Sequence, residues 1–134
     1  MTMTTETPVD TPVNTQDNPN IIEMPDEELL ARAHPMWEDL IKYSNKGQYG
    51  KFVRNFSYNL LFGLNEVEIG KQFVKSELTR NLSEDYDYLG TIRRGEHVTI
   101  LYRVRCKLKE GEWLGRMVLG YEKGEIKIFG ASIF

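Results

Sequence analysis

The sequence predicts an α+β domain, with three N-terminal helices followed by a four-stranded antiparallel meander. Apolar residues recur about every 3.6 positions before residue 85 and about every second position after it, which are the periods of helices and strands. Short glycine-containing turns at 94–96, 110–112 and 123–125 divide the later region into strands. No proline follows Pro35, as a sheet requires. A run of helices before a run of strands is typical of α+β folds.

The charges divide the chain into an acidic beginning and a basic body. Residues 1–28 hold seven of the 20 acidic residues and none of the 17 basic residues. Residues 1–22 are also rich in Thr, Pro and Asn, so they have little apolar surface whose burial could offset the entropy of ordering. We therefore expect a disordered acidic tail over 1–22 and a single domain over 24–134. The tail either solubilises the domain or masks its basic residues.

The first helix is expected to begin near Pro25, because proline suits a first turn and acidic residues follow it directly. Its apolar stripe runs through Trp37 and Leu40 and keeps its phase past Pro35. Because a proline inside a helix clashes with the preceding turn, we expect one bent helix rather than two.

Two further helices and four strands are expected after it. Capping residues at Asn45 and Asn65 precede helical apolar spacing in both cases. The second helix carries Tyr49, Phe52, Val53, Phe56 and Leu60, and the third carries Ile69, Phe73, Val74, Leu78 and Leu82. Alternating apolar residues place the strands at 86–92, 98–108, 113–121 and 126–134.

Composition excludes several kinds of segment and site. No apolar run approaches the roughly 18–20 residues needed to cross a bilayer, and residues 1–20 lack the basic and apolar parts of a secretory signal. We therefore expect a cytoplasmic protein without a membrane partner. Cys106 has no second cysteine to pair with and is expected to be a buried thiol, and together with His34 and His97 it offers too few ligands for a metal centre. No phosphate-binding glycine loop is present, and no cofactor is expected.

Four local patterns carry a resemblance to a known fold. They are Trp37 with Leu40 in the first helix, Lys46-Gly47-Gln48-Tyr49 after it, Phe52 with Phe56-Ser57, and Tyr88-Leu89-Gly90 at the start of the sheet. Through them, residues 24–134 resemble the nuclear transport factor 2-like superfamily, whose fold is shared with ketosteroid isomerases and polyketide cyclases. The resemblance implies a cone-like fold in which a curved sheet encloses an apolar pocket; cystatin-like α+β domains share this order of elements. Some members act on substrates in the pocket and many only bind, dimerise or serve as accessory modules, so the fold does not decide the function.

The resemblance implies that six aromatic residues line the pocket, which would then suit a hydrophobic small molecule. These residues are Trp37, Phe56, Phe73, Tyr88, Tyr102 and Trp113. It also implies a homodimer formed through the open face of the sheet. The sequence thus favours a non-catalytic ligand-binding or protein-interaction domain.

Catalysis in such a pocket needs a carboxylate base and a hydrogen-bond donor. The strand interiors at 98–109 and 113–121 contain no Asp or Glu, so no strand carboxylate can serve. The remaining candidates are Asp39 as the base, Tyr102 as the donor and His34 as an assisting group, with Glu66, Glu68 and Glu77 as other carboxylates. An isomerase, cyclase or dehydratase is therefore the alternative to a non-catalytic domain.

Four bases alternate along the longest predicted strand and share one of its faces. They are Arg103, Arg105, Lys107 and Lys109. Such a face could hold an anionic partner, which is the second alternative function. Because the face lacks the interleaved exposed aromatic residues of single-strand binders, nucleic acid is not favoured. A solvated outer face with cross-strand Glu partners explains the same pattern structurally.

Overall fold

The computed structural model describes residues 20–62 and 78–134. Its elements follow one another in this order: η1 (Ile21–Glu23), α2 (Asp26–Lys46), α3 (Tyr49–Phe52), α4 (Tyr58–Phe62), β1 (Leu82–Arg94), β2 (His97–Cys106), β3 (Trp113–Glu122) and β4 (Glu125–Ile133). The strands form a sheet in the order β1-β2-β3-β4, and each is antiparallel to its neighbours. The described residues therefore confirm the α+β class, with three α-helices before a four-stranded antiparallel sheet.

The first helix forms as predicted, as a single helix that continues through Pro35. Asp26, Glu27 and Glu28 occupy its first turn, where negative charge is favourable. It ends at Lys46 and is followed by Gly47, whose φ of 66° is the left-handed conformation that glycine adopts without a steric penalty. The helix thus has favourable residues at both ends, independently of the residues it buries.

The prediction of one continuous second helix is wrong. The chain leaves the helical conformation after Phe52, and Phe56 instead forms a parallel bridge with Ile128 of β4. Ser57 N donates to Ile128 O at 2.8 Å, and Ile128 N donates to Asn55 O at 2.7 Å. These two bonds to β4 satisfy backbone groups that a helix would have satisfied internally, while Phe56 is buried at the sheet edge.

Most of the predicted third helix lies outside the described residues, which end at 62 and resume at 78. Its last predicted apolar residue, Leu82, is not helical but begins β1 and pairs with Cys106. The side chain of Asn45 holds this strand start to α2, because it accepts from Leu82 N at 2.8 Å and donates to Leu82 O at 2.9 Å. The sheet therefore begins at Leu82 rather than at Tyr86.

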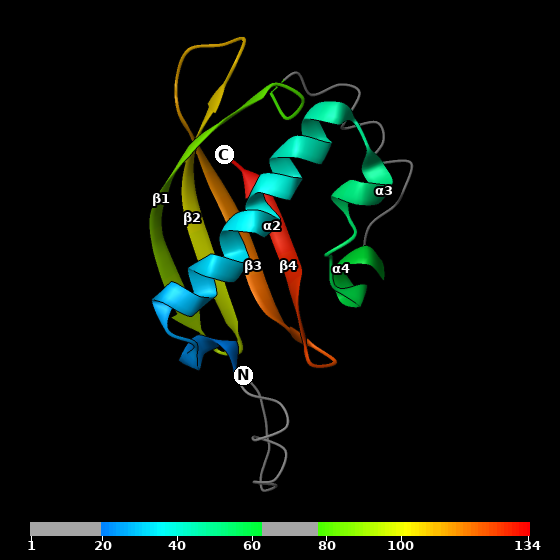
Figure 1. Cartoon of the computed structure of the whole chain (residues 1–134), viewed down its shortest axis with the longest axis vertical. Helices are drawn as coiled ribbons and strands as arrows, with labels where there is room; N and C mark the ends of the chain where they lie inside the picture. Colours follow the sequence, from blue (N-terminus) through cyan, green and yellow to red (C-terminus); the bar gives the residue numbers. More distant parts are fainter. Residues whose placement is uncertain (1–19, 63–77) are drawn as a thin grey trace, which may run out of the picture.

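Helix α2 lies across one face of the sheet, and α3 and α4 lie beside α2 and the β4 side of the sheet (Figure 1). We call the side that faces α2 the inner face. Alternate residues of β2 from Val98 to Val104 point to it and are fully buried, as are Met117 and Leu119 of β3 and Ile128 of β4. The core comprises Val98, Ile100, Tyr102, Val104, Met117, Leu119 and Ile128 from the sheet, with Leu29, Ala33, Trp37, Leu40 and Ile41 from α2.

Candidate functional site

A group of aromatic and polar side chains lies where α2 crosses β1 and β2. The indole of Trp37 stacks on the phenol ring of Tyr102, with ring centroids 4.6 Å apart and an interplanar angle of 14°. Both side chains are buried, at 2% and 0% exposure. The hydroxyl of Tyr102 is joined to Nδ1 of His34 by a hydrogen bond of 3.1 Å. A buried phenol thus reaches a half-buried imidazole on the helix.

His34 is also surrounded by strand tyrosines. Its ring centroid lies 6.0 Å from that of Tyr86 and 5.8 Å from that of Tyr88. The hydroxyl of Tyr86 donates to Oε2 of Glu38 at 2.6 Å. Glu38 follows His34 by one helical turn, and Tyr88 pairs directly with Tyr102 across the strands. We call His34, Glu38, Tyr86, Tyr88 and Tyr102 the His34 cluster.

The two inner phenols of this cluster stay protonated. Burial raises the pKa of Tyr102 far above its ordinary value. Burial also raises the pKa of Tyr86, and its hydrogen bond to Glu38 raises it further. Neither phenol can therefore act as a base near neutral pH. The cluster offers hydrogen-bond donors, one imidazole and one carboxylate.

The other predicted pocket and catalytic residues do not join this cluster. Phe56 lies at the β4 edge, Trp113 is half-buried at the start of β3, and Phe73 lies outside the described residues. Asp39, the predicted base, forms an ion pair with Arg54 at 2.6 Å. Of the predicted set, the structure brings together Trp37, Tyr88, Tyr102 and His34.

Sequence reasoning missed two members of the cluster, Glu38 and Tyr86. Signals for both were present. Glu38 lies one helical turn after His34, and Tyr86 lies two residues before Tyr88 on the same strand face. The indole Nε1 of Trp37 is buried with no hydrogen-bond partner in the described part of the chain. That indole is therefore held by packing rather than by a polar contact.

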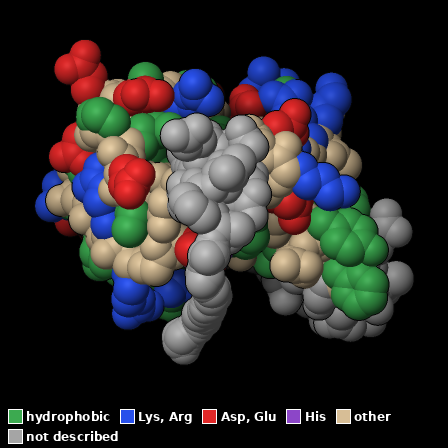
Figure 2. All heavy atoms as spheres, turned by 90° about the horizontal axis from the view of Figure 1, so that it is seen from below, with side chains coloured by type: hydrophobic (Ala, Val, Ile, Leu, Met, Phe, Trp, Pro, Cys, Tyr) green, Lys and Arg blue, Asp and Glu red, His purple; other side chains and the backbone are tan. Residues whose placement is uncertain are grey.

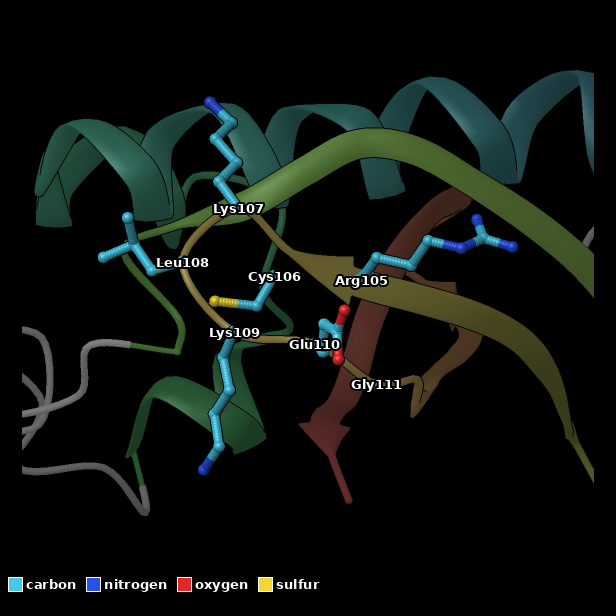
Figure 3. Close-up of a pocket in the computed structure, with 7 residues that line it drawn as sticks. All are labelled: Arg105, Cys106, Lys107, Leu108, Lys109, Glu110 and Gly111. Carbon is cyan, nitrogen blue, oxygen red and sulfur yellow. The ribbon is translucent and has the colours of Figure 1, made fainter.

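A hollow of about 350 Å³ lies elsewhere, at the connection between β2 and β3 (Figure 3). It is lined by Arg105, Cys106, Lys107, Leu108, Lys109, Glu110 and Gly111. Figure 3 shows Lys107 and Lys109 extending in opposite directions, so their ammonium groups do not converge on one point.

The predicted four-base strand face is wrong in part. Strand β2 ends at Cys106, so Lys107 and Lys109 belong to the following connection and not to a strand. Arg103 and Arg105 do share a strand face, but both contact Asp87, at 3.2 and 2.8 Å. Glu112 contacts the same two guanidinium groups at 3.3 and 3.6 Å. Two arginines and two carboxylates leave this part of the sheet without net charge.

These contacts make Asp87 an acid-sensitive group. Hydrogen bonds from Arg105 and then Arg103 lower the pKa of Asp87. A lowered folded-state pKa contributes stability above the unfolded pKa of about 3.9, and that stability is lost as pH falls through the folded value. We expect Asp87→Asn to lower the urea midpoint at pH 7. The variant should also lose less stability than the wild type when the pH falls from 4 to 2. Because the network is exposed, high salt should shrink this effect.

The matched control for Asp87→Asn is Glu84→Gln, which removes one charge from an exposed residue on the same strand. Urea unfolding of both variants at each pH is the measurement. If Glu84→Gln changes the pH profile as much as Asp87→Asn does, the effect is one of net charge and not of the arginine contacts.

Comparisons of the chain with known protein families, with curated proteins and with solved structures found no match. Within residues 20–62 and 78–134, no helix has both the length and the apolar character needed to cross a membrane. In the same residues, no three His, Cys, Asp or Glu side chains are grouped so that they could hold a metal ion. Function must therefore be argued from the geometry of this chain.

Proposed function

We propose that the domain is a protein-interaction module that forms a homodimer through the side of the sheet opposite to α2, the outer face. The observation that carries this proposal is that the described helices cover the inner face and the β4 side, and leave the outer face without a second layer. Its central side chains are mostly apolar, and the exposed Arg116 is the charged exception, between Leu114 and Val118 on β3. The uncharged ones are Ile92, Thr99, Leu101, Leu114, Val118 and Phe129. A sheet that is apolar on both faces normally packs both of them.

At the end of the outer face near the β1–β2 and β3–β4 turns, glycine makes room for two rings. The rings of His97 and Phe129 lie 4.8 Å apart, at an interplanar angle of 65°. A Cβ at Gly120 would stand 2.7 Å from His97 and 3.0 Å from Phe129. The two rings therefore lie close to the sheet surface, where a second sheet can pack at about 10 Å.

The size and charge of the face fit a second copy of the chain. Four strands spaced about 4.8 Å apart, each with about nine residues that rise about 3.3 Å, form a flat face of roughly 570 Å². Side chains that project from this face add to its accessible area, which then approaches the roughly 800 Å² that each partner contributes to a standard interface. The Arg103, Arg105, Asp87 and Glu112 group at one end of the face is neutral overall, so two copies meet there without net repulsion. A two-fold axis would bring the same patch of both copies together.

The same proposal includes the nuclear transport factor 2-like fold family. It is supported by the order of helices before a four-stranded antiparallel sheet and by α2 lying across one face of that sheet. Ligand binding inside the cone has less support, because Trp37 and Tyr102 fill the space between α2 and the sheet by stacking on each other. The isomerase alternative also has less support, because Asp39 is paired with Arg54 instead of with the His34 cluster.

The double variant Ile92→Lys/Leu114→Lys tests the dimer. Both side chains are exposed in the single chain, at 52% and 37%, so lysine should not disturb the fold of the monomer. Burying these ammonium groups between two sheets should weaken the dimer at least about a hundredfold. Sedimentation equilibrium of variant and wild type measures this change.

Leu108→Lys is the matched control, because Leu108 is 69% exposed in the connection after β2 and lies off the outer face. It should leave the dimer constant unchanged. If the control weakens the dimer as much as the double variant, or if the double variant has the wild-type constant, the outer face is not the interface.

A further inference from the structure

Three basic side chains gather around the ring of Tyr43, near the C-terminal end of α2. Nζ of Lys42 lies 5.3 Å from the ring centroid, Nζ of Lys51 lies 5.7 Å from it, and Cζ of Arg54 lies 5.2 Å from it. Lys42 belongs to α2 and Lys51 to α3, so the packing of these two helices brings the cations together. The ring itself is only 8% exposed, whereas the three bases are exposed. The ring is thus held in place by packing, and the three cations around it are accessible to solvent.

The local charges do not balance. Arg54 is paired with Asp39 at 2.6 Å, and this contact raises the pKa of Arg54. Among the described residues, neither Lys42 nor Lys51 has a carboxylate within ion-pair distance. Three positive charges and one negative charge leave two positive charges uncompensated. Their repulsion opposes this arrangement, and contact with the electron-rich face of one phenol offsets it only in part.

We propose that Lys42, Lys51 and Arg54 form a binding site for a phosphate-class oxyanion, carried either as free phosphate or as a phosphate monoester. A phosphate with nearly two negative charges matches the two uncompensated positive charges, whereas a monocarboxylate matches only one. The lysines act as mobile point charges. The guanidinium of Arg54 has five N–H donors, of which Asp39 engages only part, so others remain for the anion.

The four bases at and beyond the end of β2 are less suited to this task. Arg103 and Arg105 are paired with Asp87 and Glu112, and Lys107 and Lys109 diverge (Figure 3). At the end of the molecule seen in Figure 2, basic and acidic side chains are interspersed rather than gathered by sign. The Tyr43 group differs from these four bases because its three cations surround one ring and only Arg54 among them is paired with a carboxylate.

The test is a titration of the full-length protein at constant ionic strength, followed by the backbone amide shifts of 42–54. The probes are inorganic phosphate, phenyl phosphate and acetate. We expect saturable shifts with both phosphates and at least about fivefold weaker binding of acetate, since the loss of one unit charge at contact distance changes an exposed interaction about fivefold. Tighter binding of phenyl phosphate would assign the site to an ester, and tighter binding of inorganic phosphate would assign it to the free ion.

The variant is Lys42→Gln/Lys51→Gln, which keeps most of each side chain and removes two charges. It should weaken phosphate binding about 25-fold, by about fivefold for each ammonium removed. The control is Lys107→Gln/Lys109→Gln, which removes the same net charge from exposed residues and should weaken binding by less than about twofold. Absence of saturable phosphate binding, equal affinity for acetate, or an equal loss in both double variants would overturn the proposal.

Discussion

Replacement of Tyr102 by alanine is expected to destabilise the domain by about 3–5 kcal/mol. Tyr102 is fully buried, stacks on Trp37 at 4.6 Å and meets the edge of Tyr86 at 5.3 Å. Removing its ring would leave a cavity between α2 and the sheet that these neighbours cannot fill. Because whole domains are stable by about 5–15 kcal/mol, the variant should be close to unfolding at moderate temperature. Urea unfolding at 25 °C measures the loss.

Tyr102→Phe is the matched variant, because it keeps the ring and removes only the hydroxyl. It leaves Nδ1 of His34 without its 3.1 Å partner, and the expected cost is about 1 kcal/mol. The difference between the two variants separates packing from hydrogen bonding. Equal losses of stability in Tyr102→Ala and Tyr102→Phe would show that the stacked ring contributes little to the free energy of unfolding and that Tyr102 is not part of the packed core.

The second large effect is expected at Gly115, which lies directly beneath the indole of Trp37. A Cβ built there would stand 2.5 Å from Cζ2 of Trp37, 2.7 Å from its Cη2 and 3.3 Å from Cγ1 of Val104. The indole cannot move away easily, because Tyr102 is stacked against it. Gly115→Ala should therefore cost about 1–3 kcal/mol through overpacking, although alanine normally stabilises a strand relative to glycine.

Gly90→Ala provides the control for this prediction. Gly90 lies in β1, and a Cβ there would meet nothing within 4 Å. The variant should be neutral or more stable by up to about 1 kcal/mol, because alanine restricts the unfolded chain. Both glycine variants should be unfolded at the same protein concentration, since dimer formation adds to the apparent stability. A Gly115→Ala variant as stable as Gly90→Ala would contradict the close contact with Trp37.

The fold class followed from local patterns, but the exceptions depended on distant partners. Phe56 has helical spacing with Phe52 and Val53, yet it pairs with Ile128 of the last strand. Leu82 continued a helical stripe, yet it is the first residue of β1. Periodicity reports which residues prefer to be buried, and it contains no information about which strand will offer a bonding partner.

The candidate site was predictable only in part for a related reason. Trp37, Tyr102 and His34 were singled out from the sequence, and they are in contact. Glu38, one helical turn after His34, and Tyr86, two residues before Tyr88 without a register shift between them, could have been added from local spacing. The register of β1 on β2 does shift between Tyr88 and Gly90, so Gly90 and Ile92, which continue the same alternation in the sequence, lie on the opposite face of the sheet.

The basic strand face shows how far alternation can mislead. The pattern from Arg103 to Lys109 continues through Leu108, but Leu108 is 69% exposed and lies beyond the end of β2. Asp87, which contacts both arginines, lies 16 and 18 residues before them, and Glu112 lies in the connection that follows β2. Unbalanced positive charge lies instead around Tyr43, where two helices meet.

Sedimentation equilibrium of the wild-type chain over a range of concentrations tests the outer-face dimer most directly. We expect a mass of twice the 15.6 kDa of the chain, falling toward a single chain on dilution. A mass of 15.6 kDa at every concentration would contradict homodimer formation through the outer face.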